Sequence, residues 1–177
     1  MRLLQGEPDS AAGCAKLLVQ EAKTDKDEKL RVYAADALGY SGLPGWHSAS
    51  PEARDGLHEL LKDKNQKVRI TAAYSLAKAC RESPPEVLAD LIEGLKQNDA
   101  DLAYECAFAM NFLGTNAAPL LPELSDVLRK GDQRVAPEAA SVLAKLGDRG
   151  FAPLSAAAVD SNPTVRVSGP AGAGSRR

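Results

Sequence analysis

The sequence is poor in aromatic residues, cysteine and histidine. Aromatic residues make up 5% of its 177 residues, so the core must be built from Leu, Val and Ala, which suit closely packed helices better than a sheet sandwich. Cys14, Cys80 and Cys106 are an odd number without close pairing, which indicates reduced thiols. Neither they nor His47 and His58 have metal-ligand spacing. We therefore expect no metal and no cofactor.

The chain also lacks a strong charge imbalance and long apolar runs. It has 22 basic and 24 acidic residues, a formal net charge of -2, and no concentrated basic face of the kind that binds nucleic acid. No apolar run approaches the ~18 residues of a membrane-spanning helix. The first ten residues lack the apolar stretch of a secretory signal. We therefore expect a cytoplasmic protein that binds neither nucleic acid nor membrane.

What the sequence does contain is an internal repeat. Five times a predicted helix begins on a branched apolar residue and runs into an alanine-rich segment. These residues are Leu30, Val68, Leu102, Val135 and Val165. They lie 38, 34, 33 and 30 residues apart, and a near-constant period in this range is typical of stacked helical hairpins. The pattern predicts an all-α fold, an α-solenoid of stacked antiparallel helix pairs with about four and a half repeats.

Each repeat is predicted to be a first helix, a polar turn and a second helix. Ser50 before Pro51, and Ser83 three residues before Glu86, are signals for the start of a first helix. Pro122 removes a backbone donor, so we expect it to bend the first helix of the fourth repeat or delay its start. The predicted repeats span residues 10–42, 50–80, 83–114, 117–147 and 150–167 of a solenoid domain at 10–167.

The two ends of the sequence differ from the repeats. Residues 1–9 are predicted to be the remnant of a preceding helix or a disordered segment, and residues 168–177 a disordered tail rich in Gly and Pro. Neither end carries the polar capping repeat that normally closes a solenoid. We therefore expect a monomer or a fragment of a longer chain.

The second-helix segments share a sequence pattern. They read DEKLRVYAADAL at 27–38 and NQKVRITAAYSL at 65–76, with a polar turn, an apolar residue followed by arginine, a pair of alanines and a final leucine. This pattern resembles HEAT repeats, particularly the short bacterial-type repeats also found in phycobilisome lyases. Ala103 and Ala136 replace the arginine in the third and fourth repeats. The resemblance implies an α-solenoid that binds proteins on a concave surface lined by the second helices.

A helical wheel divides each second helix into three faces at about 100° per residue. One face, which includes Leu30 and Cys106, is predicted to be core, and a flank of small residues should face the neighbouring repeat. The third face holds five of the eight aromatic residues and is predicted, with Tyr104, to bind a protein partner of unknown identity. The predicted contact residues are Tyr33, Asp36, Tyr40, Tyr74, Lys78, Tyr104, Glu105, Phe108, Phe112 and Glu138. The alternative is that Phe108 and Phe112 pack as core.

The sequence contains few residues of two kinds that enzymes often use, histidine and cysteine. HEAT-like di-iron hydroxylases use repeated His-Glu pairs, whereas this chain has only His58-Glu59, on a first helix, so the sequence predicts no enzyme. Trp46 is expected either to cover the seam between repeats or to contact a partner. Arg31 and Arg69 are expected to bond turn carboxylates or backbone. We predict a non-catalytic interaction scaffold, the alternative being an accessory subunit of a bilin-lyase or isomerase-type enzyme.

Overall fold

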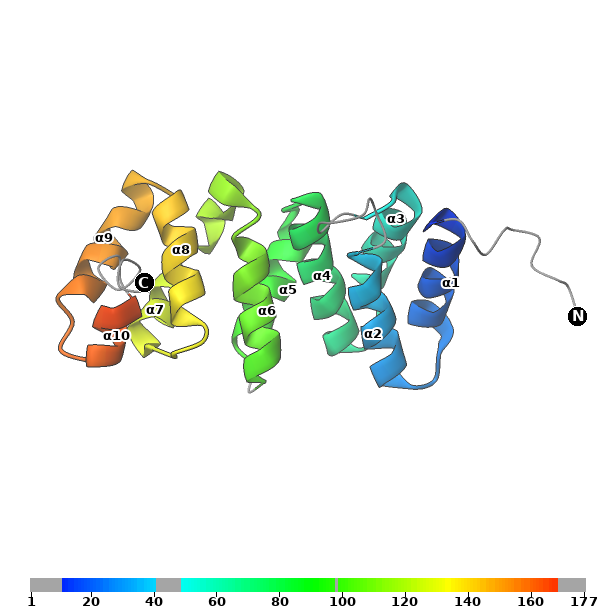
Figure 1. The fold of residues 1–177 in the computed structure, drawn as a ribbon, viewed down its shortest axis with the longest axis horizontal. Coiled ribbons are helices and arrows are strands. Elements are labelled where there is room, and N and C mark those ends of the chain that lie inside the picture. The colour runs from blue at the N-terminus through cyan, green and yellow to red at the C-terminus, as the bar shows by residue number, and fades with distance from the viewer. Residues whose placement is uncertain (1–10, 41–48, 98, 169–177) are drawn as a thin grey trace, which may run out of the picture. The chain divides into compact units, whose positions relative to one another are not determined.

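The computed structural model describes residues 11–40, 49–97 and 99–168. Within these ranges all regular elements are helices and none is a strand (Figure 1). The helices belong to two compact units, residues 1–82 and residues 83–177. The predicted fold class, an α-solenoid built of helix pairs, is confirmed.

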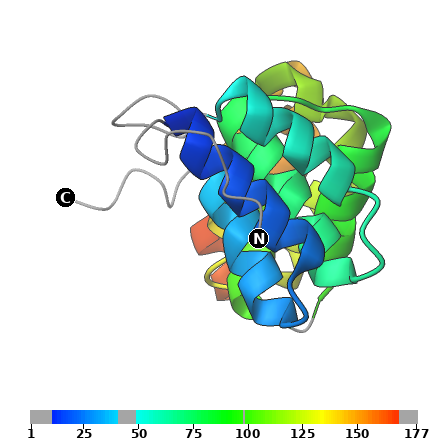
Figure 2. The same cartoon turned by 90° about the vertical axis from the view of Figure 1, so that its right-hand side faces the viewer.

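The N-terminal unit contains two helical hairpins. Its helices are α1 (Ala11–Thr24), α2 (Glu28–Leu38), α3 (Pro51–Leu60) and α4 (Gln66–Cys80). Besides the contacts within each hairpin, α1 packs on α3 and α2 packs on α4, and Figure 2 shows α1 and α2 side by side. First helices therefore stack on first helices and second helices on second helices, as in HEAT-like repeats.

The helix starts of this unit follow from polar residues in the turns. The Ser50 side chain accepts a hydrogen bond from the backbone N–H of Ala53, and Pro51 occupies the first turn of α3, as predicted. Asp27 and Asn65 cap α2 and α4 through backbone N–H groups of the following turn. Each cap satisfies a donor that the helix leaves unpaired, so each turn also fixes where the second helix begins.

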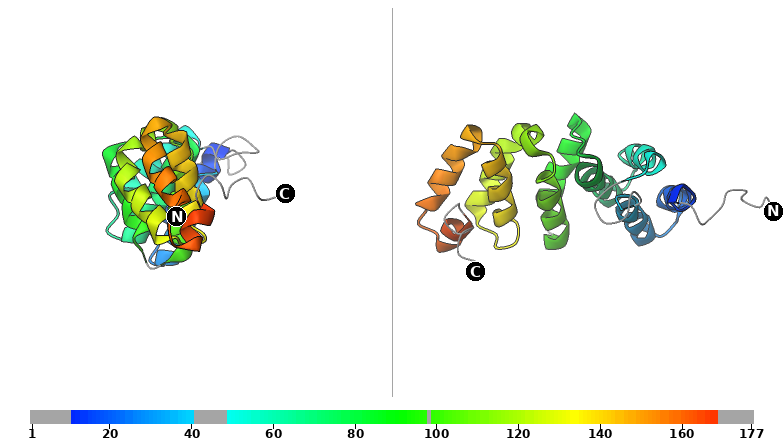
Figure 3. Two further views of the ribbon diagram at one scale, coloured as in Figure 1. Left: turned by 90° about the vertical axis from the view of Figure 1, so that its left-hand side faces the viewer. Right: turned by 45° about the horizontal axis from the view of Figure 1, so that its top comes forward.

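The C-terminal unit contains three hairpins and a 3-10 segment. Its elements are α5 (Pro85–Leu95), α6 (Ala100–Met110), η1 (Gly114–Leu120), α7 (Leu121–Lys130), α8 (Ala136–Lys145), α9 (Asp148–Ala158) and α10 (Pro163–Ser168). The second helices pack in sequence, α6 on α8 and α8 on α10, while the first helix α7 packs on α9 (Figure 3). Both units therefore use the same stacking rule.

The helices α7 and α5 both have a proline in their first turn. Pro122 lies in the first turn of α7, directly after the 3-10 segment, so proline delays the helix instead of bending it. The predicted capping role of Ser83 is wrong, because α5 begins at Pro85 with Pro84 at its cap position and no side-chain hydrogen bond there. The proline at the first helical position fixes the backbone there without a cap.

The core consists of leucine, valine and alanine. Among the start positions of the second helices, Val68, Val135 and Val165 are buried and Leu102 is half-buried. Leu30 occupies the same repeat position, yet half of its surface is exposed. The prediction that Leu30 is a core residue is therefore wrong.

The reason lies in what covers this position in the other repeats. Val135 clusters with Ala103 and Ala107 of the preceding second helix α6. Val165 lies against Gly131, in the turn of the preceding hairpin. The position is thus covered by the preceding repeat, and α1–α2 is the first hairpin that the structure describes. Cys106, by contrast, is fully buried as predicted.

Some expectations fall outside the described residues. These concern the segments 1–9 and 169–177, and Trp46 and His47 in the connection between α2 and α3. The described part of the last second helix, α10, ends at Ser168.

Gly150 marks a close approach of α9 to α8 and gives a test of the packing. A Cβ atom at this position would overlap the backbone carbonyl of Leu143, which cannot move away cheaply. Gly150→Ala should therefore lower the free energy of unfolding by about 1–3 kcal/mol, although alanine favours helix by about 1 kcal/mol. Chemical denaturation monitored by circular dichroism measures the effect. Ser155→Ala on the exposed side of α9 is the control, and an unchanged Gly150→Ala would contradict the close packing.

Candidate functional site

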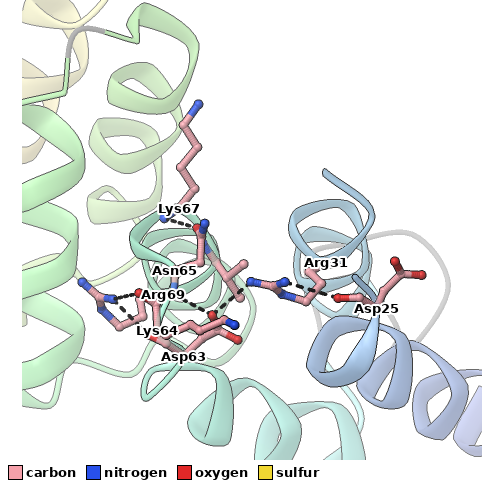
Figure 4. A network of polar contacts seen from close by, with 8 residues as sticks. Asp25, Arg31, Asp63, Lys64, Asn65, Lys67 and Arg69 are labelled. Carbon is pink, nitrogen blue, oxygen red and sulfur yellow. Dashed lines mark hydrogen bonds and ion pairs between the residues drawn. The ribbon is translucent and has the colours of Figure 1, made fainter. Parts of the chain in front are cut away.

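Arg31 joins the turns of the first two repeats (Figure 4). One guanidinium nitrogen donates to the carbonyl oxygen of Asp25 at 3.2 Å, and the other donates to the carboxylate of Asp63 at 3.3 Å. The side chains of Arg31 and Asp63 are only 9% and 13% exposed. The expectation that Arg31 bonds a turn carboxylate and backbone is confirmed, which makes it a structural residue.

The same motif recurs in other turns. Arg69 donates to the carbonyl oxygen of Asp63 at 2.9 Å, and Arg166 to that of Asp160 at 2.7 Å. In each case the arginine follows its aspartate by six residues. The third and fourth repeats lack both members, with Gln97 and Ala103 in one and Lys130 and Ala136 in the other. The missing arginines are evident from the sequence pattern alone, whereas the paired loss of the aspartates is evident only from the six-residue spacing that the structure shows.

The predicted contact face of the N-terminal unit is centred on a buried lysine. Lys78 of α4 is 2% exposed. Its Nζ donates to the Tyr40 hydroxyl at 2.7 Å and lies 4.3 Å from the centre of the same ring. It is also 3.7 Å from the Asp36 carboxylate and 5.0 Å from the Tyr74 ring. A buried ammonium is costly unless it is paired, so this set of contacts is what permits the lysine to lie there.

Exposure divides the predicted residues of this unit into two groups. Tyr74 is 6% exposed and donates its hydroxyl to Asp36 at 2.8 Å, so Tyr74 and Lys78 support the surface from below. Tyr33 and Tyr40 are 69% and 50% exposed, and the Asp36 side chain is 39% exposed. Of the predicted contact residues in this unit, only Tyr33, Asp36 and Tyr40 are accessible from solvent, so the predicted contact surface is smaller than the sequence suggests.

In the C-terminal unit the aromatic residues form a row along α6. Tyr104 and Phe108 stack with ring centres 6.1 Å apart, and Phe108 meets Phe112 edge to face at 5.3 Å. All three side chains are partly exposed. The guanidinium of Arg134 lies 5.6 Å from the Tyr104 ring and pairs with Asp101 at 2.8 Å. The three rings therefore form a row that is partly exposed and partly packed.

The acidic residues of this face are held by neighbours. Glu138 accepts a hydrogen bond from the Asn111 side-chain amide at 2.8 Å, and Lys145 donates to the Asn111 carbonyl and amide oxygens at 3.0 and 3.1 Å. Glu105 is half-buried. The helical wheel places Asn111 on the small-residue flank. Its bridging role cannot be predicted from one helix, because that role depends on a residue of the next repeat.

Among the other reactive side chains that the structure describes, His58 and Cys80 lie near Glu82. His58 pairs with Glu82 at 2.6 Å, and Arg54 lies 3.8 Å from the same carboxylate. Burial, together with the nearby Glu82, raises the pKa of the Cys80 thiol to about 11. Burial also raises the pKa of Cys106 far above its ordinary value. Within the described ranges, no three His, Cys, Asp or Glu side chains gather closely enough to hold a metal ion.

Two comparisons place this fold in a known class of all-α repeat proteins. The family model for HEAT repeats matches residues 15–111, which is more than half of the chain. The chain therefore belongs to the HEAT-repeat family. A crystal structure of an engineered protein, a target of a structural genomics consortium, is similar to it with a TM-score of 0.52 over 88% of this chain and 76% of that chain. At 20% sequence identity this likeness shows the fold alone.

Neither a curated relative nor, within the described residues, a membrane-spanning helix adds to this assignment. No curated protein matches the sequence. Across the described residues, none of the helices combines the length and apolar character that crossing a membrane requires.

The link between turns through Arg31 can be tested by truncation. Arg31→Ala should lower the free energy of unfolding by about 3 kcal/mol, because it leaves the Asp63 carboxylate without its buried partner. Lys29→Ala, at an exposed position of the same helix, should change it by less than about 0.5 kcal/mol. Urea unfolding of both variants measures the difference. Equal small effects would show that the contact contributes nothing.

The three cysteines should differ in reactivity toward a disulfide reagent such as dithionitrobenzoate. Cys14 is exposed and should react first in the folded protein. Cys80 should react slowly at pH 8, and its rate should rise about tenfold per pH unit until pH approaches its raised pKa, because only the thiolate attacks. Cys106 should react only after unfolding. Three equally fast thiols would contradict the burial described here.

Proposed function

We propose that this chain is a non-catalytic scaffold that binds a protein partner through the exposed residues of its second helices. The HEAT-repeat fold is generally associated with protein interaction, which supports the coarser part of this proposal. The finer part depends on the side chains of α2 and α6. The single observation that carries it is an exposed tyrosine held in place by a buried lysine.

Tyr40 has the properties of an interface anchor. Half of its surface is open, yet its hydroxyl accepts a hydrogen bond from Lys78 and its ring lies against the same ammonium group. Tyrosine is enriched among the residues that dominate binding energy. A side chain whose orientation is already fixed loses less conformational entropy on binding. The buried lysine therefore prepares Tyr40 for contact without itself touching the partner.

Two neighbours extend this surface along α2. Tyr33 adds a large exposed aromatic ring, and Asp36 adds a carboxylate that Tyr74 holds in position. Apolar contact area beside an oriented polar group is the usual composition of a recognition site. We propose that these three residues form the contact surface of the N-terminal unit.

In the C-terminal unit we propose a second contact surface on α6. Its members are Tyr104, Phe108 and Phe112, whose stacked rings are partly exposed. Glu105 and Glu138 border the row. The partial burial of these rings also supports a packing role, so their truncation affects stability as well as binding and the decisive test belongs on α2.

Catalysis has less support. The raised pKa of Cys80 leaves its thiol protonated near neutral pH, and His58 is paired with Glu82. The family match is to HEAT repeats as a class and adds no support for the bilin-lyase alternative. The scaffold is therefore the function that we propose.

The test is partner capture by the immobilised full chain from an extract of the source cells. The double variant Tyr33→Ser and Tyr40→Ser should lose at least tenfold of the captured partner, because it removes two exposed aromatic anchors. Its melting temperature should fall, because Tyr40→Ser removes one contact of the buried Lys78, so circular dichroism at the assay temperature must show that the variant is as helical as the unchanged chain. Tyr33→Ser alone, at a side chain that is 69% exposed, should lower capture without this loss of stability. Quantitative mass spectrometry of the bound fraction measures the loss.

Phe151→Ser is the matched control. Phe151 is 69% exposed, the same fraction as Tyr33, but lies on the first helix α9. Capture that falls equally in the control and in the double variant would indicate non-specific apolar adsorption. Capture that survives the double variant would contradict the proposed surface on α2.

A further inference from the structure

The large apolar side chains that remain exposed are concentrated in two hairpins. Among the described residues they are Leu17, Leu30, Tyr33, Tyr40, Phe151 and Val159. The first four belong to α1 and α2 or directly follow them, and the last two belong to α9 and its end. In the described chain from α3 to α8 no large apolar side chain is exposed to this degree. The uncovered apolar surface therefore lies on the first and the last hairpin that the structure describes.

Leu30 identifies this surface as half of a repeat interface. The equivalent residues Val135 and Val165 are covered by the preceding hairpin, as their contacts with α6 and with Gly131 show. Leu30 is half exposed because the described chain places no hairpin before α1. What would cover Leu30 is therefore the second helix and turn of another HEAT-like repeat.

Asp25 shows that the same end also has an open polar position. Its Oδ1 accepts the backbone N–H of Asp27 at 2.7 Å, just as Oδ1 of Asp63 accepts that of Asn65 at 2.7 Å. Asp63 additionally receives Arg31 from the preceding repeat. Within the described part of the chain no arginine reaches the Asp25 carboxylate, so its turn is built for a partner that the preceding repeat would supply.

The last described hairpin carries the complementary group. Arg166 of α10 is exposed, and its Nη1 donates to the carbonyl oxygens of Asp160 and Ser161 at 2.7 and 2.9 Å. Arg31 uses one guanidinium nitrogen for its own turn in the same way and reaches forward to Asp63 with the other. Arg166 thus binds its own turn through Nη1, as Arg69 does, and the other terminal nitrogen of its guanidinium is the one that Arg31 uses for the aspartate of the following repeat.

We propose that the α1–α2 hairpin is an assembly surface that receives the α9–α10 hairpin of a second copy of this chain. In this head-to-tail contact Arg166 of one copy bonds Asp25 of the other, and α10 covers Leu30. Two observations support this contact. Arg166 and Asp25 correspond to the observed pair Arg31 and Asp63, and Leu30 corresponds to Val135, which the preceding repeat covers. The two surfaces differ, so the contact is heterologous and can recur from copy to copy.

Sedimentation equilibrium of the full chain from about 10 μM to 1 mM tests this proposal, a range that detects contacts of only moderate strength. The average mass should rise above the 18.7 kDa of one chain as concentration increases. Asp25→Arg and Arg166→Asp should each abolish the rise, because each places like charges at the contact. Leu30→Asp should abolish it too, with unchanged helicity because Leu30 is already half exposed.

Mixing the two charge variants gives the sharpest outcome. Arg166 of the Asp25→Arg chain still meets Asp25 of the Arg166→Asp chain, so the mixture should regain association that neither variant shows alone. The exchanged charges at the other two ends are also opposite, so the complex forms at least one to one. The first of these contacts uses only the native end of each variant, so it does not depend on whether either substitution disturbs its own hairpin. Lys67→Glu, an exposed charge reversal in the second repeat, is the control and should assemble like the unchanged chain.

A chain that stays at one copy up to 1 mM would overturn the proposal. It would also be overturned if the charge variants or Leu30→Asp assembled normally, or if the mixture of variants stayed monomeric.

Discussion

No hairpin of this protein can bury its apolar face alone, and the contact between successive hairpins is the constraint on which the fold depends. Small side chains allow the second helices to approach, since the Ser75 hydroxyl of α4 reaches the carbonyl oxygen of Ala35 in α2 at 3.2 Å. The clamp between Arg31 and Asp63 then sets the distance between neighbouring turns. Apolar contact supplies the free energy of stacking, and the clamp specifies its register.

The same stacking creates the candidate contact surface. Lys78 can lie buried in α4 only because α2 brings Asp36 and Tyr40 to it. In return the lysine orients a tyrosine that faces outward. The exposed tyrosine and the buried lysine therefore depend on each other, and in the proposed function the tyrosine contacts the partner while the lysine orients it.

The sequence predicts the repeat, the helix pairs and the structural role of Arg31, because these depend on local patterns of period, capping and turn chemistry. It does not predict that Leu30 is exposed or that Tyr74 and Lys78 are buried. A helical wheel ranks the faces of one helix, whereas burial depends on which neighbours are present and how closely they approach. The cap at Ser83 was mispredicted for a related reason, since Pro84 and Pro85 position the helix start without it.

The paired loss of the buried clamp in the third and fourth repeats has a mechanical consequence. There, among the residues that the structure describes, the ion pair between the helix starts is Arg134 with Asp101, whose side chains are 52% and 85% exposed and therefore well screened by water. The other polar links between these two hairpins pass through Asn111, which binds Glu138 and Lys145 of α8, so the turns themselves lack a buried ionic link. The turns of these two hairpins should therefore shift past each other more readily than the turns that Arg31 and Asp63 join.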